Sequence, residues 1–90
     1  MKHYVYILKS CRDSKRYIGM TTDLERRLGE HNAKKTKSTK GRGPFVLEYF
    51  EEFDTRLAAR EREKYFKTAA GRRLITEKLI INYQQLAIDN

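Results

Sequence analysis

A short alternating run near the start of the chain limits most strongly how it can fold. The run is Tyr4–Leu8, in which aromatic, β-branched and aliphatic residues follow one another. This pattern is typical of a half-buried strand, and it puts Tyr6 on the face opposite its valine and isoleucine neighbours. A polar, turn-prone break over residues 10–14 and the run Arg16–Ile18 predict a β-hairpin, whose second strand ends at Gly19.

A helix is predicted directly after the hairpin, from Thr22 to about Asn32. Thr22 as N-cap and Glu25 three residues later form a capping-box pattern. Two leucines four residues apart give the helix its buried stripe. Arg27 and His31 are also four residues apart, on the row beside that stripe. We therefore expect their side chains to face the same way at the edge of the core.

The second half of the chain begins with a third strand over residues 45–53, which are rich in aromatic and β-branched residues. A second helix follows, capped by Asp54 or Thr55 and ending near Lys67. Steps of four and three along this helix place Glu63 on its inward face, among apolar neighbours. A carboxylate in that position needs a cation, because an isolated buried charge is very costly.

The pattern determines the end of the chain less well. Residues 68–71 are expected to break the second helix, and a short third helix follows around Leu74 and Ile75. From residue 76 onwards, helix and strand fit equally. We expect one domain over residues 1–90, with its core over residues 2–77 and a C-terminal extension over residues 78–90.

The charge balance favours a polyanionic partner, with nucleic acid as the first candidate and simple solubility as the alternative. Twenty lysines and arginines against twelve acidic residues leave a net charge of +8. Cys11 is the only cysteine, so no intrachain disulfide forms and a reduced, cytoplasmic compartment is the default. No apolar run is long enough for a membrane span, so no membrane partner is expected.

The segment from Ala33 to Gly43 is basic and contains no acidic residue. Its positive side chains are those of Lys34, Lys35, Lys37, Lys40 and Arg42. Such a loop suits the sugar–phosphate backbone of a nucleic acid, although a solvated connection has the same composition. Lys15 in the hairpin turn and Arg26 on the first helix are further candidates for phosphate contact.

The order and spacing of these residues resemble the GIY-YIG nuclease family, including its small stand-alone members and the N-terminal nuclease domain of the excision-repair subunit UvrC. The resemblance rests on Tyr4-Val5-Tyr6, Tyr17-Ile18-Gly19 ten residues later, Asp23–Leu28, His31-Asn32, Pro44 and Arg62–Lys64. It covers residues 4–75. One departure is that the first motif begins with Tyr4 where the family has glycine. Several stand-alone members depart from the family pattern in the same way.

This resemblance implies an α/β (α+β) fold with a three-stranded antiparallel sheet flanked by helices, in the order β-β-α-β-α-α. It implies a metal-dependent endonuclease that hydrolyses DNA phosphodiester bonds, with structure-specific or weak sequence recognition, in DNA repair or recombination. DNA is then the expected partner, RNA is not excluded, and a protein partner for targeting is a further alternative. The alternatives are a non-catalytic nucleic-acid-binding module on the same fold and a scaffold protein without a nucleic-acid role.

The resemblance aligns Glu63 with the family's metal-binding glutamate, which implies a Mg²⁺ or Mn²⁺ site. Magnesium often uses one or two carboxylates together with substrate phosphate. From the residues alone, a salt bridge between Glu63 and a base such as Arg27 is an equal alternative. Arg27 is expected to bind the scissile phosphate, because its planar fork stays charged and fits phosphate well.

Two tyrosines complete the expected catalytic set. Tyr6 is expected to act as the base or to position the attacking water, with Tyr17 as its partner, although a phenol is a poor base at neutral pH. Core aromatics with satisfied hydroxyls are the alternative. His31 is expected to assist proton transfer or to contact phosphate, with a surface histidine as the alternative. Gly19 is expected to let backbone or substrate approach the Tyr17 side.

Overall fold

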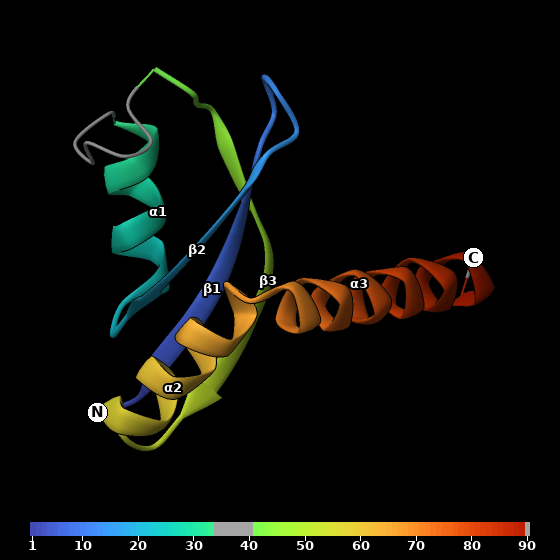
Figure 1. Ribbon diagram of the computed structural model, residues 1–90. Helices are drawn as coiled ribbons and strands as arrows, with labels where there is room; N and C mark the ends of the chain where they lie inside the picture. Colours follow the sequence, from blue (N-terminus) through green and yellow to red (C-terminus); the bar gives the residue numbers. More distant parts are fainter. Residues whose placement is uncertain (34–40, 90) are drawn as a thin grey trace.

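The computed structural model describes residues 1–33 and 41–89, with side chains described as far as residue 79. Three strands and three helices follow one another as β1 (His3–Ser10), β2 (Arg16–Thr21), α1 (Leu24–Asn32), β3 (Phe45–Phe53), α2 (Arg56–Phe66) and α3 (Ala69–Asp89). The sheet is antiparallel with strand order β2-β1-β3, so the hairpin partner β2 lies at an edge (Figure 1). This confirms the predicted fold class and element order.

The central strand β1 buries both of its faces, whereas the alternation in its sequence predicts a half-buried strand. Val5 and Ile7 pack on one face with residues of α2 and α3. Tyr6 lies on the other face in a cluster with Leu8 and Phe45, against which the two leucines of α1 pack. Helix α1 therefore covers one face of the sheet, and α2 with the start of α3 covers the other (Figure 1).

Two helix caps differ in how well the sequence predicted them. Helix α1 is capped by Asp23, whose carboxylate accepts a hydrogen bond from the Arg26 amide at 3.1 Å, so the prediction of Thr22 as N-cap is wrong. A carboxylate is at least as good a cap as a hydroxyl, and it also matches the helix dipole. Helix α2 is capped by Thr55, one of the two predicted residues, at 3.2 Å from the Ala58 amide.

The prediction of a short third helix is wrong, because α3 runs without interruption for 21 residues. Gly71 lies in its first turn, where a Cβ atom would come within 2.6 Å of the Tyr65 carbonyl carbon and 2.7 Å of Phe66 Cα. The glycine thus permits close packing of α3 on the end of α2 and does not end a helix. Within the described residues, no helix combines the length and apolar character needed to cross a bilayer.

Candidate active site

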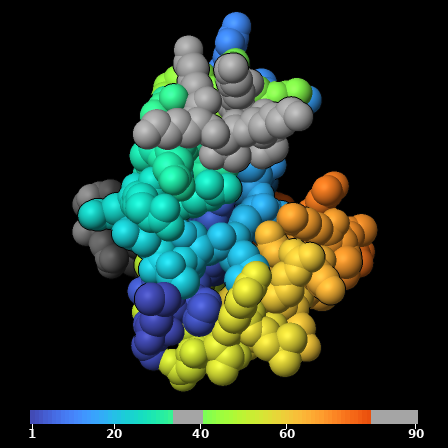
Figure 2. Space-filling view, turned by 90° about the vertical axis from the view of Figure 1, so that its left-hand side faces the viewer, coloured from blue at the N-terminus to red at the C-terminus, as the bar shows by residue number. Residues whose placement is uncertain are grey.

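A cleft of about 740 Å³ opens along the edge strand β2, between α1 and α2. Figure 2 shows β2 at the surface with α1 on one side and α2 on the other. The residues that line the cleft come from all three helices, β1 and β2. They are Tyr6, Arg16, Tyr17, Ile18, Gly19, Met20, Arg27, His31, Arg56, Arg60, Glu63, Lys67 and Arg72. The structure therefore brings all five predicted catalytic residues and Gly19 to one cavity.

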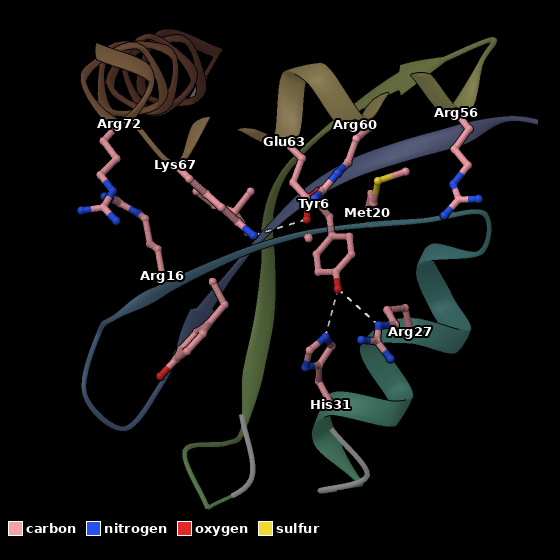
Figure 3. Close-up of a pocket in the computed structure, with 13 residues that line it drawn as sticks. Tyr6, Arg16, Met20, Arg27, His31, Arg56, Arg60, Glu63, Lys67 and Arg72 are labelled. Carbon is pink, nitrogen blue, oxygen red and sulfur yellow. Dashed lines mark hydrogen bonds and ion pairs between the residues drawn. The ribbon is translucent and has the colours of Figure 1, made fainter. Parts of the chain in front are cut away.

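The hydroxyl of Tyr6 forms the centre of a hydrogen-bonded group on the α1 side of the cleft (Figure 3). Its oxygen lies 3.0 Å from His31 Nε2 and accepts a hydrogen bond from Arg27 Nε at 3.3 Å. Arg27 and His31 do face the same way, as their spacing predicts. A second bond from Arg27 Nη1 to Glu30 at 3.3 Å fixes the guanidinium from behind.

Burial controls the protonation of this group. His31 is only 4% exposed, which excludes the alternative of a surface histidine. Burial, followed by the nearby positive charge of Arg27, lowers the pKa of His31 below its usual 6.5, so the imidazole is neutral at physiological pH. The hydrogen bond to Tyr6 raises the pKa of Arg27, so its guanidinium stays charged throughout.

Gly19 is directly opposite Tyr6 in the pairing of β1 with β2. A Cβ atom at this position would overlap the Tyr6 hydroxyl and lie 2.6 Å from Cζ of the same ring. The glycine therefore makes room for the Tyr6 ring. We expected Gly19 to let backbone or substrate approach the Tyr17 side. The close approach in the structure is made by the ring of Tyr6.

Glu63 points into the cleft from α2, and its side chain is 8% exposed. Its carboxylate accepts hydrogen bonds from Arg60 Nη1 at 2.6 Å and from Lys67 Nζ at 3.4 Å (Figure 3). These partners lie three residues before and four residues after Glu63 on the same side of the helix. The alternative of a salt bridge is therefore present among the described contacts of Glu63, with Arg60 and Lys67 as partners in place of Arg27.

The residues around Glu63 fit a metal ion that draws most of its ligands from substrate. In the described part of the chain, no group of three potential histidine, cysteine or carboxylate ligands comes together. A buried carboxylate that faces a cleft is nevertheless suited to Mg²⁺, which keeps several waters and binds phosphate oxygens as well.

Tyr17 lines the cleft and packs against the same apolar cluster as Tyr6, but its hydroxyl has a different partner. Its hydroxyl accepts a hydrogen bond from Arg42 Nη1 at 3.1 Å, and its ring packs edge to face on Phe45 at 5.3 Å. Arg42 also pairs with Asp13 at 3.7 Å. No hydrogen bond between the two tyrosine hydroxyls occurs among the described contacts, and the role of Tyr17 as partner of Tyr6 stays a prediction.

The other predicted nucleic-acid contacts that the structure describes lie outside the cleft. Arg26 is mostly exposed and pairs with Glu30 at 3.4 Å. Lys15 lines a neighbouring cavity. The four basic loop residues, Lys34, Lys35, Lys37 and Lys40, lie outside the described residues.

A basic wall that sequence reasoning missed faces Tyr6 across the cleft. It consists of Arg56, Arg60 and Lys67 around Glu63 on the α2 side, and Arg72 at the start of α3 (Figure 3). The first three residues and Glu63 follow at steps of four, three and four, which is one face of a helix. That spacing could have predicted that these side chains share one face. Nothing in the sequence predicts that Arg72 joins them, because its position depends on how α3 packs.

Comparison with known proteins finds one matching family and several similar small proteins. The GIY-YIG catalytic domain matches residues 2–76. A UPF0213 protein of Haloquadratum walsbyi is 54% identical over 67 residues, covering 73% of this chain and 74% of that protein. A UPF0213 protein of Natronomonas pharaonis is 44% identical over 80 residues, covering 84% and 93%.

Two solved structures have the same fold. The solution structure of the UPF0213 protein BH0048 from Bacillus halodurans is 38% identical, with a TM-score of 0.53 over 86% of this chain and 84% of that one. Protein EF2693 from E. faecalis is 37% identical, with a TM-score of 0.55 over 88% of each chain.

Proposed function

The chain belongs to the GIY-YIG family, and we propose that it is a metal-dependent endonuclease that hydrolyses phosphodiester bonds in DNA. The observation that carries this proposal is the hydroxyl of Tyr6, which Arg27 and His31 hold at the edge of a cleft that also contains the buried Glu63. Hydrolysis needs a group that takes a proton from water, a cation for the phosphate, and stabilisation of the leaving oxygen.

Tyr6 and His31 supply the proton acceptor. A neutral phenol is a weak base on its own, but a neutral imidazole at 3.0 Å can take the hydroxyl proton as the phenol oxygen takes one from water. The low pKa of His31 keeps the imidazole neutral and ready for this step. Tyr6 thus acts as the base toward water, and His31 is the final proton acceptor.

Arg27 binds the scissile phosphate and matches the charge that develops on it. A guanidinium has five N–H donors, and the contacts to Tyr6 and Glu30 use two of them. Its fork geometry suits two phosphate oxygens at once. Because Arg27 also touches Tyr6, the phosphate that it binds lies next to the group that activates water.

Glu63 would hold the divalent ion, Mg²⁺ or Mn²⁺, which stabilises the leaving oxygen when it is bound. The carboxylate lines the cleft opposite Arg27, on the α2 side. Arg60 and Lys67 offset its charge in the absence of an ion. Tyr17 lines the same cleft and Arg42 donates a hydrogen bond to its hydroxyl, and we assign both to substrate contact.

The substrate is a structured or weakly sequence-specific DNA site, and we infer a role in repair or recombination in the cytoplasm. The net charge of +8 and the basic wall favour contact with backbone phosphates, which carry no sequence information. RNA is a second possible substrate, and selection of the target site falls to DNA shape or a protein partner. A non-catalytic binding module would not need the Tyr6–Arg27–His31 arrangement.

The test is a cleavage assay on a panel of single-stranded, nicked, flapped and branched DNA, with single-stranded RNA for comparison. Each substrate is incubated with Mg²⁺, Mn²⁺ or a chelator. We expect cut strands with either metal and none with the chelator. Binding to the panel without cleavage in any metal would reject the nuclease and support the binding module.

A further inference from the structure

A second cavity of about 360 Å³ lies beside the cleft, between the β1–β2 turn and the start of α3. The two cavities share Arg16, Ile18 and Arg72 in their walls. A polymer bound in the cleft can therefore continue into the second cavity without leaving the protein surface.

The lining of this second cavity combines charge and apolar surface. Lys15, Arg16 and Arg72 supply three positive side chains, all exposed. The apolar surface within reach of a ligand comes from the half-buried Ile18, while Ile7 and Ile75, at 0% and 3% exposure, are core residues that reach the cavity wall. Cations suit a phosphate, and branched aliphatic side chains suit the face of a base or the sugar beside it. The two kinds of surface thus match the two parts of one nucleotide.

The positive side chains are not equivalent. Arg16 donates to both carboxylate oxygens of Glu48, at 2.9 Å and 3.1 Å, which fixes its guanidinium and offsets part of its charge. Lys15 and Arg72 are then the residues that contribute most to the attraction of a phosphate. Arg72 also lines the cleft, so it lies at the passage from one cavity to the other.

We propose that the second cavity binds one unpaired nucleotide of the DNA strand whose scissile phosphate lies in the cleft. This inference rests on the proposed function and names its substrate class: DNA with an unpaired segment next to the cleavage point. A base within a duplex is stacked and paired, and it enters a side cavity only after it is flipped out. Among the described residues, no aromatic ring or amide side chain lines the cavity, and we expect the subsite to accept any base.

The test is a scan of abasic positions along a flap of single-stranded DNA. A labelled hairpin duplex carries the flap at a fixed junction, and one flap nucleotide at a time loses its base while its phosphate stays. Binding is measured by fluorescence anisotropy in chelator. We expect one or two adjacent positions to weaken binding about tenfold, because loss of the base removes its apolar contact with Ile18.

Three variants separate this subsite from general electrostatic attraction. Arg72→Gln should weaken binding of the flap more than Arg73→Gln, which removes the same charge from the next residue of α3 without lining either cavity. Thr76→Phe adds bulk inside the cavity at an exposed helix position. It should bind the intact flap as weakly as the wild type binds the abasic one, and its abasic scan should be flat. Circular dichroism checks that each variant is folded.

A flat scan for the wild-type protein, or equal losses for the two arginine variants, would overturn the subsite. Cleavage of the same oligonucleotide with Mg²⁺ is measured separately. Cleavage together with a flat scan rejects the subsite and leaves the proposed nuclease standing. A peaked scan without cleavage supports the subsite and rejects the nuclease.

Discussion

Adding one methyl group at Gly19 is the most direct test of the role given to Tyr6. In Gly19→Ala the new Cβ atom would lie 2.6 Å from Cζ of the Tyr6 ring. Gly19 does not have a positive φ, so the backbone tolerates alanine and the effect is steric. The ring of Tyr6 is buried, at 4% exposure, and it can yield only by moving away from β2.

The size of the effect follows from this overlap. Carbon atoms in contact prefer separations of about 3.5–4.0 Å, so the ring must move by about 1 Å. Overpacking of this kind costs about 1–3 kcal/mol. For a domain of this size, each kcal/mol lowers Tm by about 4–8 °C. A shift of about 1 Å in a reacting group costs about a hundredfold in rate.

We therefore expect Gly19→Ala to fold, to melt at a lower temperature and to cleave DNA about a hundredfold more slowly than the wild type. Thermal melting and single-turnover cleavage measure the two effects. Gly29→Ala is the matched control, because a Cβ atom there meets nothing within 4 Å. Alanine in this helical position should stabilise the protein by about 1 kcal/mol and leave the rate unchanged.

A double-mutant cycle tests the cause. Tyr6→Phe removes the hydroxyl that overlaps most with the new methyl group. The double variant should therefore lose less stability than the sum of the losses of Gly19→Ala and Tyr6→Phe. Fully additive losses, or a Gly19→Ala variant with normal rate and stability, would refute the link between this glycine and the position of Tyr6.

Three further predictions concern the other residues of the site. Arg27→Lys keeps the charge but loses the fork, so the cleavage rate should fall more than DNA affinity; proportional losses would make Arg27 a simple anchor. Glu63→Gln should bind DNA at least as tightly as the wild type and fail to cleave, which binding and cleavage assays on one substrate decide. Because burial lowers the folded-state pKa of His31 below its unfolded value near 6.5, the unfolded chain binds more protons as the pH falls. The free energy of unfolding should therefore fall with pH below 6.5, and denaturant melts of His31→Gln should lack this part of the decrease.

Local patterns in the sequence predict the parts of the site that lie on single elements. The alternation of β1 places Tyr6 correctly, and the four-residue spacing of α1 brings Arg27 and His31 to one hydroxyl. The inward position of Glu63 also follows from its helical phase. These inferences succeed because side-chain direction within one strand or helix is fixed by backbone geometry.

Contacts between elements were not predictable in the same way. The pairing of Tyr17 with Arg42 depends on where the loop before β3 returns to β2, and spacing in the sequence does not determine this. The need for Gly19 depends on the register of the hairpin, which puts it opposite Tyr6. Gly71 suggests a helix end by its type, yet it lies where α3 meets the carbonyl of Tyr65. In each case the partner belongs to another element.

The ion pairs of Glu63 change how its metal role has to be tested. Arg60 and Lys67 are 53% and 52% exposed, so Glu63→Gln leaves them in water and costs little stability. A small change in Tm for this variant is thus expected whether or not Glu63 binds a metal. The metal role requires a further effect, measured on DNA whose scissile linkage cannot be hydrolysed. By mass action, Mg²⁺ should raise the Tm of the wild-type complex more than that of the Glu63→Gln complex. Equal shifts for the two complexes would mean that the ion binds elsewhere, and the role given to Glu63 would be wrong.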